Sequence, residues 1–150
     1  CLGTRVLLRE ELSQEVLIRK KMPETLCKRS VENRKNCLRS VFLARLFSFK
    51  NHGMNGVRTC NFAFWRKDAL AVNGFNEAFI GWGREDSEFT ARLFNYGLMR
   101  NSVKFNALAY HLYHPRNDRS HLPENDKLLR ETIEQKKIWC DKGVNAYFKQ

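Results

Sequence analysis

The segment 81–97 restricts the fold more than any other part of this sequence. It reads GWGREDSEFTARLFNYG, in which apolar residues recur at helical spacing and glycines stand at both ends. The first turn of a helix exposes unpaired N–H groups and a partial positive charge, which acidic side chains neutralise. The sequence therefore predicts a helix from about residue 84 to Gly97, with three acids on its first turn: Glu85, Asp86 and Glu88.

The remaining segments predict short strands that alternate with amphipathic helices. Strands are expected over 4–8, 60–65 and 103–114, and helices over 10–22, 31–50, 67–73 and 124–140. Gly74, directly after the third of these helices, is a natural left-handed cap. With 150 residues, of which 43% are hydrophobic, the chain can bury the core of one domain or of one lobe of a larger one.

Basic residues are in excess, and they concentrate in the N-terminal third of the chain. The net charge is +11, and residues 1–50 hold 12 basic and 5 acidic side chains. Such an excess indicates an anionic partner. Within this third, the segment 31–50 has two interpretations. It is either a helix that packs on the core through residues such as Val41, Phe42 and Leu46, or a basic amphipathic surface that contacts anionic lipid.

Cysteine content and hydropathy bear on the compartment. The five cysteines include no Cys-x-x-Cys pair, which argues against a disulfide framework or zinc site and favours a reducing compartment. No run approaches the ~20 apolar residues of a membrane-spanning helix, and the first residues lack the pattern of a signal peptide. Because the chain does not begin with Met, we expect a processed chain or an excised piece, located in the cytoplasm.

The three acids of the predicted helix start have two interpretations. They stabilise a helix start whatever the function, and acidic first turns are common. However, Gly81 and Gly83 also give an open approach to Trp82, whose ring is a good stacking surface for a sugar. Adjacent helix residues point about 100° apart, so Glu85 and Asp86 cannot both cap the helix. One can face a pocket as a hydrogen-bond acceptor while the other acts as a general base.

Three motifs occur in order along the chain: N-F-A-F-W-R-K from Asn61, G-F-N-E-A-F-x-G-W-G-x-E-D-x-E-F from Gly74, and H-x-x-H from His111. They resemble the C-terminal part of inverting GT-A glycosyltransferases, both bacterial family 2 enzymes of surface-polysaccharide synthesis and the galactosyltransferase C-terminal region shared by β-1,4-galactosyltransferases and chondroitin polymerases. The similarity is strongest from Asn55 to His114. It implies an α/β fold, namely the C-terminal portion of a nucleotide-diphospho-sugar transferase (GT-A) fold, with a short mixed sheet packed with helices.

The resemblance implies transfer of a sugar from a nucleotide diphosphate sugar to a saccharide or lipid-linked saccharide acceptor, with inversion at the anomeric carbon. By position, Asp86 matches the catalytic base that takes the proton from the attacking hydroxyl. Glu85 matches the acidic neighbour that binds the acceptor, and Trp82 and Gly83 match the segment that shapes the sugar site. Asn61, at the start of the first motif, is assigned to substrate binding on the same ground.

The resemblance also implies a divalent cation, Mn²⁺ or Mg²⁺, with His111 and His114 as candidate ligands. Imidazole is the usual nitrogen ligand for metal ions in proteins. From the residues alone, a histidine in a strand is more often an ordinary core or surface residue. Moreover, i, i+3 spacing on an extended segment directs the two side chains to opposite faces. Binding of one ion by both requires a turn between them, so His111 is the stronger candidate.

Members of this family place a nucleotide-binding half, with an Asp-x-Asp signature, before the region seen here. The 150 residues contain no Asp-x-Asp. We therefore expect residues 1–150 to be the acceptor-side C-terminal part of a glycosyltransferase catalytic domain, inactive by itself. The complete enzyme is expected to act in cell-surface polysaccharide or lipopolysaccharide synthesis, with peripheral contact at the inner face of the membrane.

Two other functions fit parts of the sequence. A non-catalytic carbohydrate-binding domain would keep the sugar site without the chemistry. A nucleic-acid-binding module would use the basic charge and the 12% aromatic residues. However, no helix-turn-helix, zinc-binding or RNA-recognition pattern occurs, and such a module leaves the acidic motif unexplained. We therefore predict no nucleic-acid partner.

Overall fold

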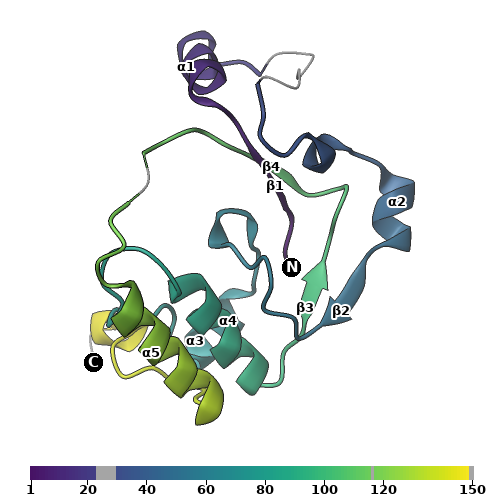
Figure 1. Ribbon diagram of the computed structural model, residues 1–150. Helices are drawn as coiled ribbons and strands as arrows, with labels where there is room; N and C mark the ends of the chain where they lie inside the picture. The colour runs from purple at the N-terminus through teal and green to yellow at the C-terminus, as the bar shows by residue number, and fades with distance from the viewer. Residues whose placement is uncertain (23–29, 116, 149–150) are drawn as a thin grey trace.

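The computed structural model describes residues 1–22, 30–115 and 117–148, along which short strands and helices alternate (Figure 1). The strands are β1 (Thr4–Leu7), β2 (Phe49–Asn51), β3 (Arg100–Ser102) and β4 (Leu108–His111). The α-helices are α1 (Glu10–Arg19), α2 (Val41–Leu46), α3 (Arg66–Ala71), α4 (Glu85–Asn95) and α5 (Leu122–Glu134). Short 3₁₀ turns are η1 (Arg34–Cys37), η2 (Thr59–Asn61) and η3 (Val144–Tyr147). The predicted α/β class is confirmed.

The strands form two small sheets of two strands each. β1 pairs with β4 in parallel, so that Leu7 lies opposite His111 at the carboxyl end of both strands. β2 pairs with β3 in the antiparallel direction, with Phe49 opposite Ser102. A parallel pair needs a long connection between its strands. The chain from β1 to β4 therefore contains most of the other elements, and the end of β4 is fixed against the start of the chain.

Two apolar cores support these elements. The first gathers buried side chains of β1, α1 and the segment after it: Val6, Leu8, Leu12 and Val31. The second lies between α3 and α4 and consists of Val72, Phe89 and Leu93. Figure 1 shows the same division, because α1, β1 and β4 form one group of elements and α3, α4 and α5 form another. The connections between the two groups are therefore important for any site that uses residues of both.

Helix α4 is the helix predicted from segment 81–97. It begins at Glu85 and carries all three acids in its first turn, as expected. After it ends, Gly97 adopts a left-handed conformation with φ 96°, and the N–H of Leu98 reaches back to the carbonyl oxygen of Leu93 at 3.0 Å. This bond closes the helix by the usual glycine cap. The strand predicted over 4–8 and the helices predicted over 10–22, 67–73 and 124–140 are confirmed with somewhat different bounds.

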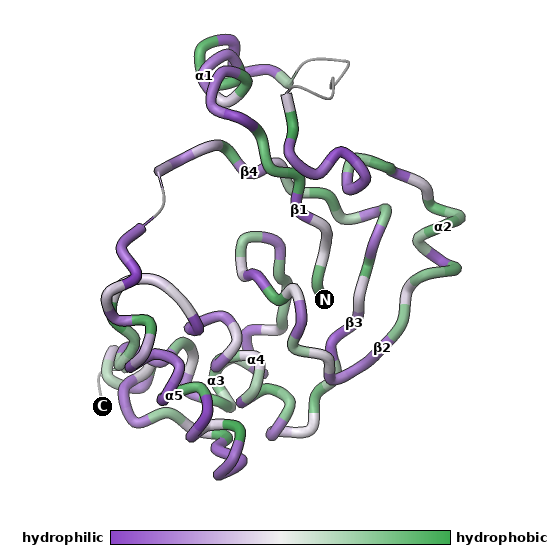
Figure 2. The backbone as a smooth tube through the Cα atoms, in the orientation of Figure 1, coloured by the Kyte–Doolittle hydropathy of each residue, from purple (hydrophilic) through white to green (hydrophobic). Residues whose placement is uncertain are grey.

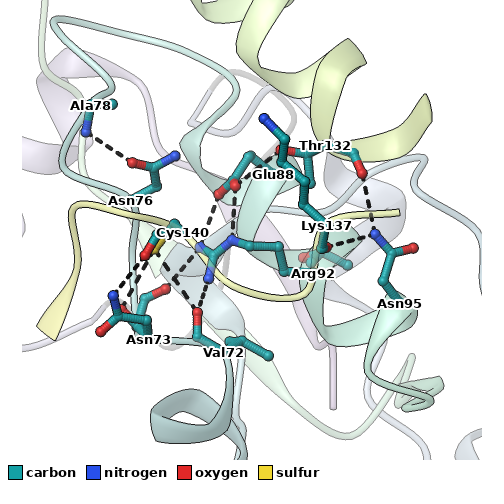
Figure 3. Close-up of polar contacts among 12 residues, drawn as sticks. Val72, Asn73, Asn76, Ala78, Glu88, Arg92, Asn95, Thr132, Lys137 and Cys140 are labelled. Atoms are coloured by element: carbon teal, nitrogen blue, oxygen red, sulfur yellow. Dashed lines mark hydrogen bonds and ion pairs between the residues drawn. The ribbon is translucent and has the colours of Figure 1, made fainter. Parts of the chain in front are cut away.

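A buried ion pair joins α4 to two other segments (Figure 3). The Glu88 carboxylate receives hydrogen bonds from Arg92 Nε at 2.8 Å and Nη2 at 2.9 Å, and the two side chains are 1% and 0% exposed. Arg92 also donates to the carbonyl oxygens of Val72 and Gly74, directly after α3. The hydroxyl of Thr132 in α5 donates to Glu88 Oε1 at 3.2 Å. The pair therefore holds α3, α4 and α5 together.

The end of α3 also binds the segment 140–145, near the end of the described chain, through hydrogen bonds of Asn73. Asn73 Nδ2 donates to the carbonyl oxygen of Cys140 at 2.7 Å and to Asn145 Oδ1 at 2.8 Å. Asn73 and Gly74 are both left-handed, with φ 66° and 69°, so the predicted cap at Gly74 is confirmed. A side chain at position 143 would not fit, because a Cβ on Gly143 would lie 2.1 Å from the Asn73 carbonyl oxygen.

We expect Glu88→Gln to lower the free energy of unfolding by about 3–5 kcal/mol, since it leaves the buried Arg92 charge without its counterion. Urea unfolding followed by circular dichroism measures the loss.

Glu15→Gln on α1 is the matched control for this variant. It breaks an ion pair to Arg19 with the same i, i+4 spacing. In that pair the side chain of Glu15 is 44% exposed and that of Arg19 is 72% exposed. Exposed pairs contribute about 0–1 kcal/mol, so this variant is expected to unfold almost like the wild type. Equal and small losses in both variants would contradict the role given to the buried pair.

The helix predicted over 31–50 is wrong over most of its length. Only α2 is α-helical there, because the Ser40 hydroxyl caps its first turn and Phe49 enters β2. The core-packing interpretation is also wrong, since Phe42 is 74% exposed and Leu46 is 65% exposed. Figure 2 shows α2, mostly green, at the edge of the molecule. The lipid-contact interpretation stays a prediction.

The buried strand predicted over 60–65 is also wrong. The turn η2 occupies its start, and only Phe62 pairs with another segment, through a single bridge to Leu2. The rings of Phe62 and Phe64 instead pack on Phe89, with centroids 6.4 Å and 5.1 Å away, while Trp65 stays exposed. A short apolar run has no periodicity that separates a strand from an irregular segment packed on a core.

The cysteines and the helices bear on the predicted compartment. Cys1, Cys37, Cys60 and Cys140 are free thiols, and Cys27 lies outside the described residues. Within residues 1–22, 30–115 and 117–148, every helix is too short or too polar to span a bilayer.

Candidate functional site

The carboxylate of Asp86 is held by one residue from a distant part of the chain. Thr59, the first residue of η2, donates its backbone N–H to Asp86 Oδ2 at 3.1 Å and its hydroxyl to Oδ1 at 2.5 Å. A carboxylate offers about four acceptor positions, so these two bonds fix its orientation and leave acceptor capacity on both oxygens. Asp86 is half-buried. It is thus an oriented carboxylate that can still accept a proton.

The other two acids of the first turn have different surroundings. Glu88 is fully buried, and its oxygens are occupied by Arg92 and Thr132. Glu85 is half-buried, and among the described residues no hydrogen bond or ion pair reaches its carboxylate. Of the three acids, Glu88 has a structural role, Asp86 is held in position and Glu85 is free to bind a ligand.

The loop before α4 turns sharply around Trp82. Gly81, Gly83 and Arg84 all have left-handed backbone conformations, with φ 70°, 110° and 76°. A Cβ on Gly83 would lie 3.0 Å from Leu122 Cδ1 in α5. Gly81 and Gly83 therefore allow the left-handed backbone of this loop, in addition to the open approach to Trp82 that the sequence indicated.

Trp82 is stacked rather than loose. The guanidinium carbon of Arg119 lies 4.3 Å from the centroid of its ring, within the range of a cation–π contact. The indole is 38% exposed. One face of the ring is thus covered by a cation, and part of the side chain remains accessible to a ligand.

His111 and His114 lie together at the end of β4. Their Nε2 atoms are 3.2 Å apart. An i, i+3 pair on one extended segment would point to opposite faces, but β4 ends at His111, so the strand geometry does not apply to His114 and the two rings meet. Burial, followed by the charges of Arg5 and His114, lowers the pKa of His111 below its ordinary value. The His111 ring is therefore neutral over a wider pH range than a free histidine.

The tautomer of His114 is set by its neighbour. His114 Nδ1 lies 2.8 Å from the carbonyl oxygen of Pro115, which can only accept, so Nδ1 carries a proton. In the neutral ring Nε2 then carries a lone pair, which faces His111 Nε2 at 3.2 Å. Histidines that bind metals commonly donate their other ring nitrogen to a carbonyl in this way.

The two histidines fit part of a metal site. Two nitrogens bound to one ion at about 2.1 Å lie roughly 3 Å apart, which agrees with the 3.2 Å between the His111 and His114 Nε2 atoms. In the part of the chain that the structure describes, no group of three or more His, Cys, Asp and Glu side chains is placed to hold an ion. The described residues therefore offer two candidate nitrogen ligands, and a complete metal site would need further ligands.

A cavity of about 540 Å³ brings three of the predicted residues together. Trp82, His111 and His114 line it, with Arg5 of β1 and Arg119 beside them. Glu32 is the acid among its lining residues. Asp86 and Glu85 do not line this cavity. The arrangement suits a ligand that combines negative charge, which the arginines attract, with a ring that can stack on an indole.

Asn61 has a structural task in addition to its predicted role. Its Nδ2 donates to the carbonyl oxygens of Thr4 at 2.8 Å and Ala107 at 3.0 Å, and so joins β1 to the segment before β4. Both protons of the amide nitrogen are used in these bonds. Substrate binding by Asn61 stays a prediction, and the side-chain oxygen is the group that could serve it.

Three residues of the site were not predicted from the sequence: Thr59, Arg5 and Arg119. Thr59 precedes Asn61 by two positions, so its neighbourhood was marked by a motif, but nothing in the sequence pairs it with Asp86. Arg5 and Arg119 belong to ordinary basic segments. Only the fold brings them to Trp82 and the histidines.

Known proteins match this chain over much of its length. A family model described as the N-terminal domain of galactosyltransferase matches residues 40–115, just over half of the chain. Chondroitin synthase from Escherichia coli is 34% identical over 110 residues, which covers 67% of this chain and 15% of that protein. Fold, site and similarity together define a region of a glycosyltransferase. The chain belongs to the family of the galactosyltransferase N-terminal domain.

The comparisons also show how much of such a protein is present. The chain spans 15% of the length of the E. coli relative. The matching family is described as an N-terminal domain, whereas the motifs resemble a C-terminal region, so the two agree on the family and differ on the name of the part. No solved structure matches this chain significantly.

We expect Thr59→Val to lower the free energy of unfolding by about 1–2 kcal/mol, because it removes the hydroxyl hydrogen bond to a half-buried carboxylate. Ser87→Ala, also on the first turn of α4, is the control, since within the described residues the Ser87 hydroxyl makes no hydrogen bond that could be lost. Urea unfolding compares the two variants. Equal losses would show that Thr59 does not hold Asp86.

Proposed function

We propose that this chain forms the acceptor-side part of an inverting glycosyltransferase, which moves a sugar from a nucleotide diphosphate sugar to a saccharide acceptor. The observation that carries the proposal is the meeting of Trp82, His111 and His114 in one cavity with two arginines. These residues come from distant parts of the chain. The resemblance assigned Trp82 to sugar binding and the two histidines to metal binding. Membership of the galactosyltransferase family supports the same conclusion.

In the proposed reaction Asp86 is the general base. The acceptor hydroxyl oxygen bonds to the anomeric carbon, the bond from that carbon to the diphosphate breaks, and the hydroxyl proton passes to the Asp86 carboxylate. Thr59 supports this role, because a base must be oriented toward the proton it removes. Glu85 accepts hydrogen bonds from the acceptor, which its unpartnered carboxylate permits. Trp82 supplies a ring face for a sugar, and Gly83 allows the backbone turn beside it.

The leaving diphosphate faces the cationic cavity in this proposal. Arg5 and Arg119 supply fixed positive charges, and guanidinium groups match phosphate oxygens well. His111 and His114 would provide two ligands for Mn²⁺ or Mg²⁺, and a divalent cation bound there would neutralise charge on the diphosphate. The neutral state favoured at His111 suits this role, because only an unprotonated nitrogen binds a metal.

We infer that residues 1–150 do not complete the reaction alone. They contain no Asp-x-Asp and span 15% of the E. coli relative. The name of that relative, chondroitin synthase, supports placing this chain in polysaccharide synthesis. A cytoplasmic location is part of the proposal, and free thiols at the four described cysteines are in keeping with it.

In the full-length enzyme we expect Asp86→Asn to lower the rate of sugar transfer by about 10²-fold or more, since a lost general base costs that much. Asparagine can keep a hydrogen bond to Thr59, so donor binding should survive. Transfer rates and donor affinity are measured on the same preparation.

Asp68→Asn is the control for this variant, because Asp68 is also a half-buried acid in the first turn of a helix, α3. It should leave transfer near the wild-type rate. Near-normal transfer by the Asp86 variant would instead move the role of base to Glu85, because Glu88 is occupied by Arg92. The isolated 150-residue chain is expected to show no turnover.

Metal binding gives a separate test. In the full-length enzyme we expect His111→Ala and His114→Ala each to weaken Mn²⁺ binding by about tenfold or more, as removal of a ligand or of its support does. The electron paramagnetic resonance signal of free Mn²⁺ reports the affinity. His52→Ala, at an exposed histidine outside the cavity, is the control. Unchanged affinity in both site variants would remove the histidines from the proposed metal site.

A further inference from the structure

The surface around α2 combines exposed apolar side chains with unpaired positive charge. The apolar members, which we call the α2 patch, are Leu38, Val41, Phe42, Leu46, Phe47 and Phe49, and each is between 47% and 74% exposed. An apolar surface of this kind on a protein usually marks an interaction site. Helix α2 lies at the edge of the molecule (Figures 1 and 2), and the side chains of the patch are exposed within the described chain.

The fold holds this patch in place. Ser40 caps α2, and its N–H donates to the carbonyl oxygen of Phe105 at 2.9 Å. The rings of Phe47 and Phe105 meet edge to face at 5.8 Å, and Ala44 on the inner side of α2 is buried. The exposed side chains of α2 therefore project from a short helix that is fixed to the rest of the fold.

The charge around the patch has one sign. From residue 33 to residue 67 the sequence has eight basic residues and no acidic one. Arg45 lies four positions after Val41 and three after Phe42, so its side chain is among the apolar ones on the outer face of α2. Within the described residues, Arg39, Arg45 and Lys50 form no ion pair.

We propose that the α2 patch is a docking surface for the headgroup region of an anionic lipid bilayer. Phenylalanine and leucine side chains enter the boundary between headgroups and acyl chains, while arginine and lysine heads reach the lipid phosphates. A bilayer surface supplies distributed negative charge, which matches a basic segment that lacks acids. This surface is separate from the cavity lined by Trp82 and the histidines, and the proposal does not depend on sugar transfer.

Vesicle co-sedimentation of the 150-residue chain tests the proposal without any donor or acceptor sugar. We expect binding to vesicles of equal parts phosphatidylglycerol and phosphatidylcholine at low salt, little binding to pure phosphatidylcholine, and release at high salt. The double variant Phe42→Ser with Leu46→Ser should lower the partition coefficient by about tenfold or more. Arg39→Gln with Arg45→Gln should lower it roughly tenfold to thirtyfold, since each basic residue near such a surface contributes about fivefold.

Matched changes elsewhere separate this patch from general charge and hydrophobicity. Leu17→Ser with Ile18→Ser removes two exposed apolar side chains from α1, and Lys127→Gln with Arg130→Gln removes two exposed charges from α5. Both variants should bind vesicles within about twofold of the wild type, because the changed residues lie outside the surface that contacts the bilayer. Unchanged circular dichroism and urea midpoints show that the variants are folded.

Three results would overturn the proposal. The first is absence of binding to anionic vesicles at low salt. The second is loss of binding in the control variants as large as in the α2 variants. The third is concentration-dependent self-association of the chain that the Phe42 and Leu46 changes abolish, without vesicle binding, because a second copy of the chain would then occupy the patch.

Discussion

The buried ion pair of Glu88 and Arg92 determines how α4 is oriented within the molecule. Because it ties the helix to the end of α3 and to α5, the helix cannot rotate without separating buried charges. Successive residues of a helix point about 100° apart. Once Glu88 faces inward, Asp86 lies on nearly the opposite side, where Thr59 meets it. One acid of the motif thus fixes the direction in which another points.

The cavity depends on a second constraint, the parallel pairing of β1 with β4. This register puts His111 opposite Leu7 and beside Arg5, on the side of the molecule built around the first apolar core. Trp82 comes from the other group of elements, in the loop before α4. Its contact with Arg119 lies in the connection between β4 and α5. The site therefore forms where the two groups meet, and neither group contains it alone.

The sequence predicted the features that depend on residues close together in the chain. The α4 helix was predictable because glycines, first-turn acids and apolar spacing all agree, and the i, i+4 spacing of Glu88 and Arg92 allows an ion pair on such a helix. Contacts between distant segments had no such signal: Thr59 and Asp86 are 27 positions apart. The histidine pair depends on where β4 ends, which periodicity does not indicate. Segment 31–50 has helical spacing, but Phe49 pairs with Ser102, and this tertiary contact overrides the local preference.

The proposed reaction gives a chemical reason for the separation of Asp86 and Glu85 from Arg5 and Arg119. Transfer of a sugar from a diphosphate needs a carboxylate beside the attacking hydroxyl and positive charge beside the leaving group. If Asp86 lay between Arg5 and Arg119, an ion pair would satisfy both and leave neither for substrate. Here the arginines and histidines line the cavity together with Glu32, whereas Asp86 is held by the uncharged Thr59 and Glu85 has no partner in the described chain. A neutral hydrogen-bond donor thus orients the carboxylate that we propose as the base, without neutralising its charge.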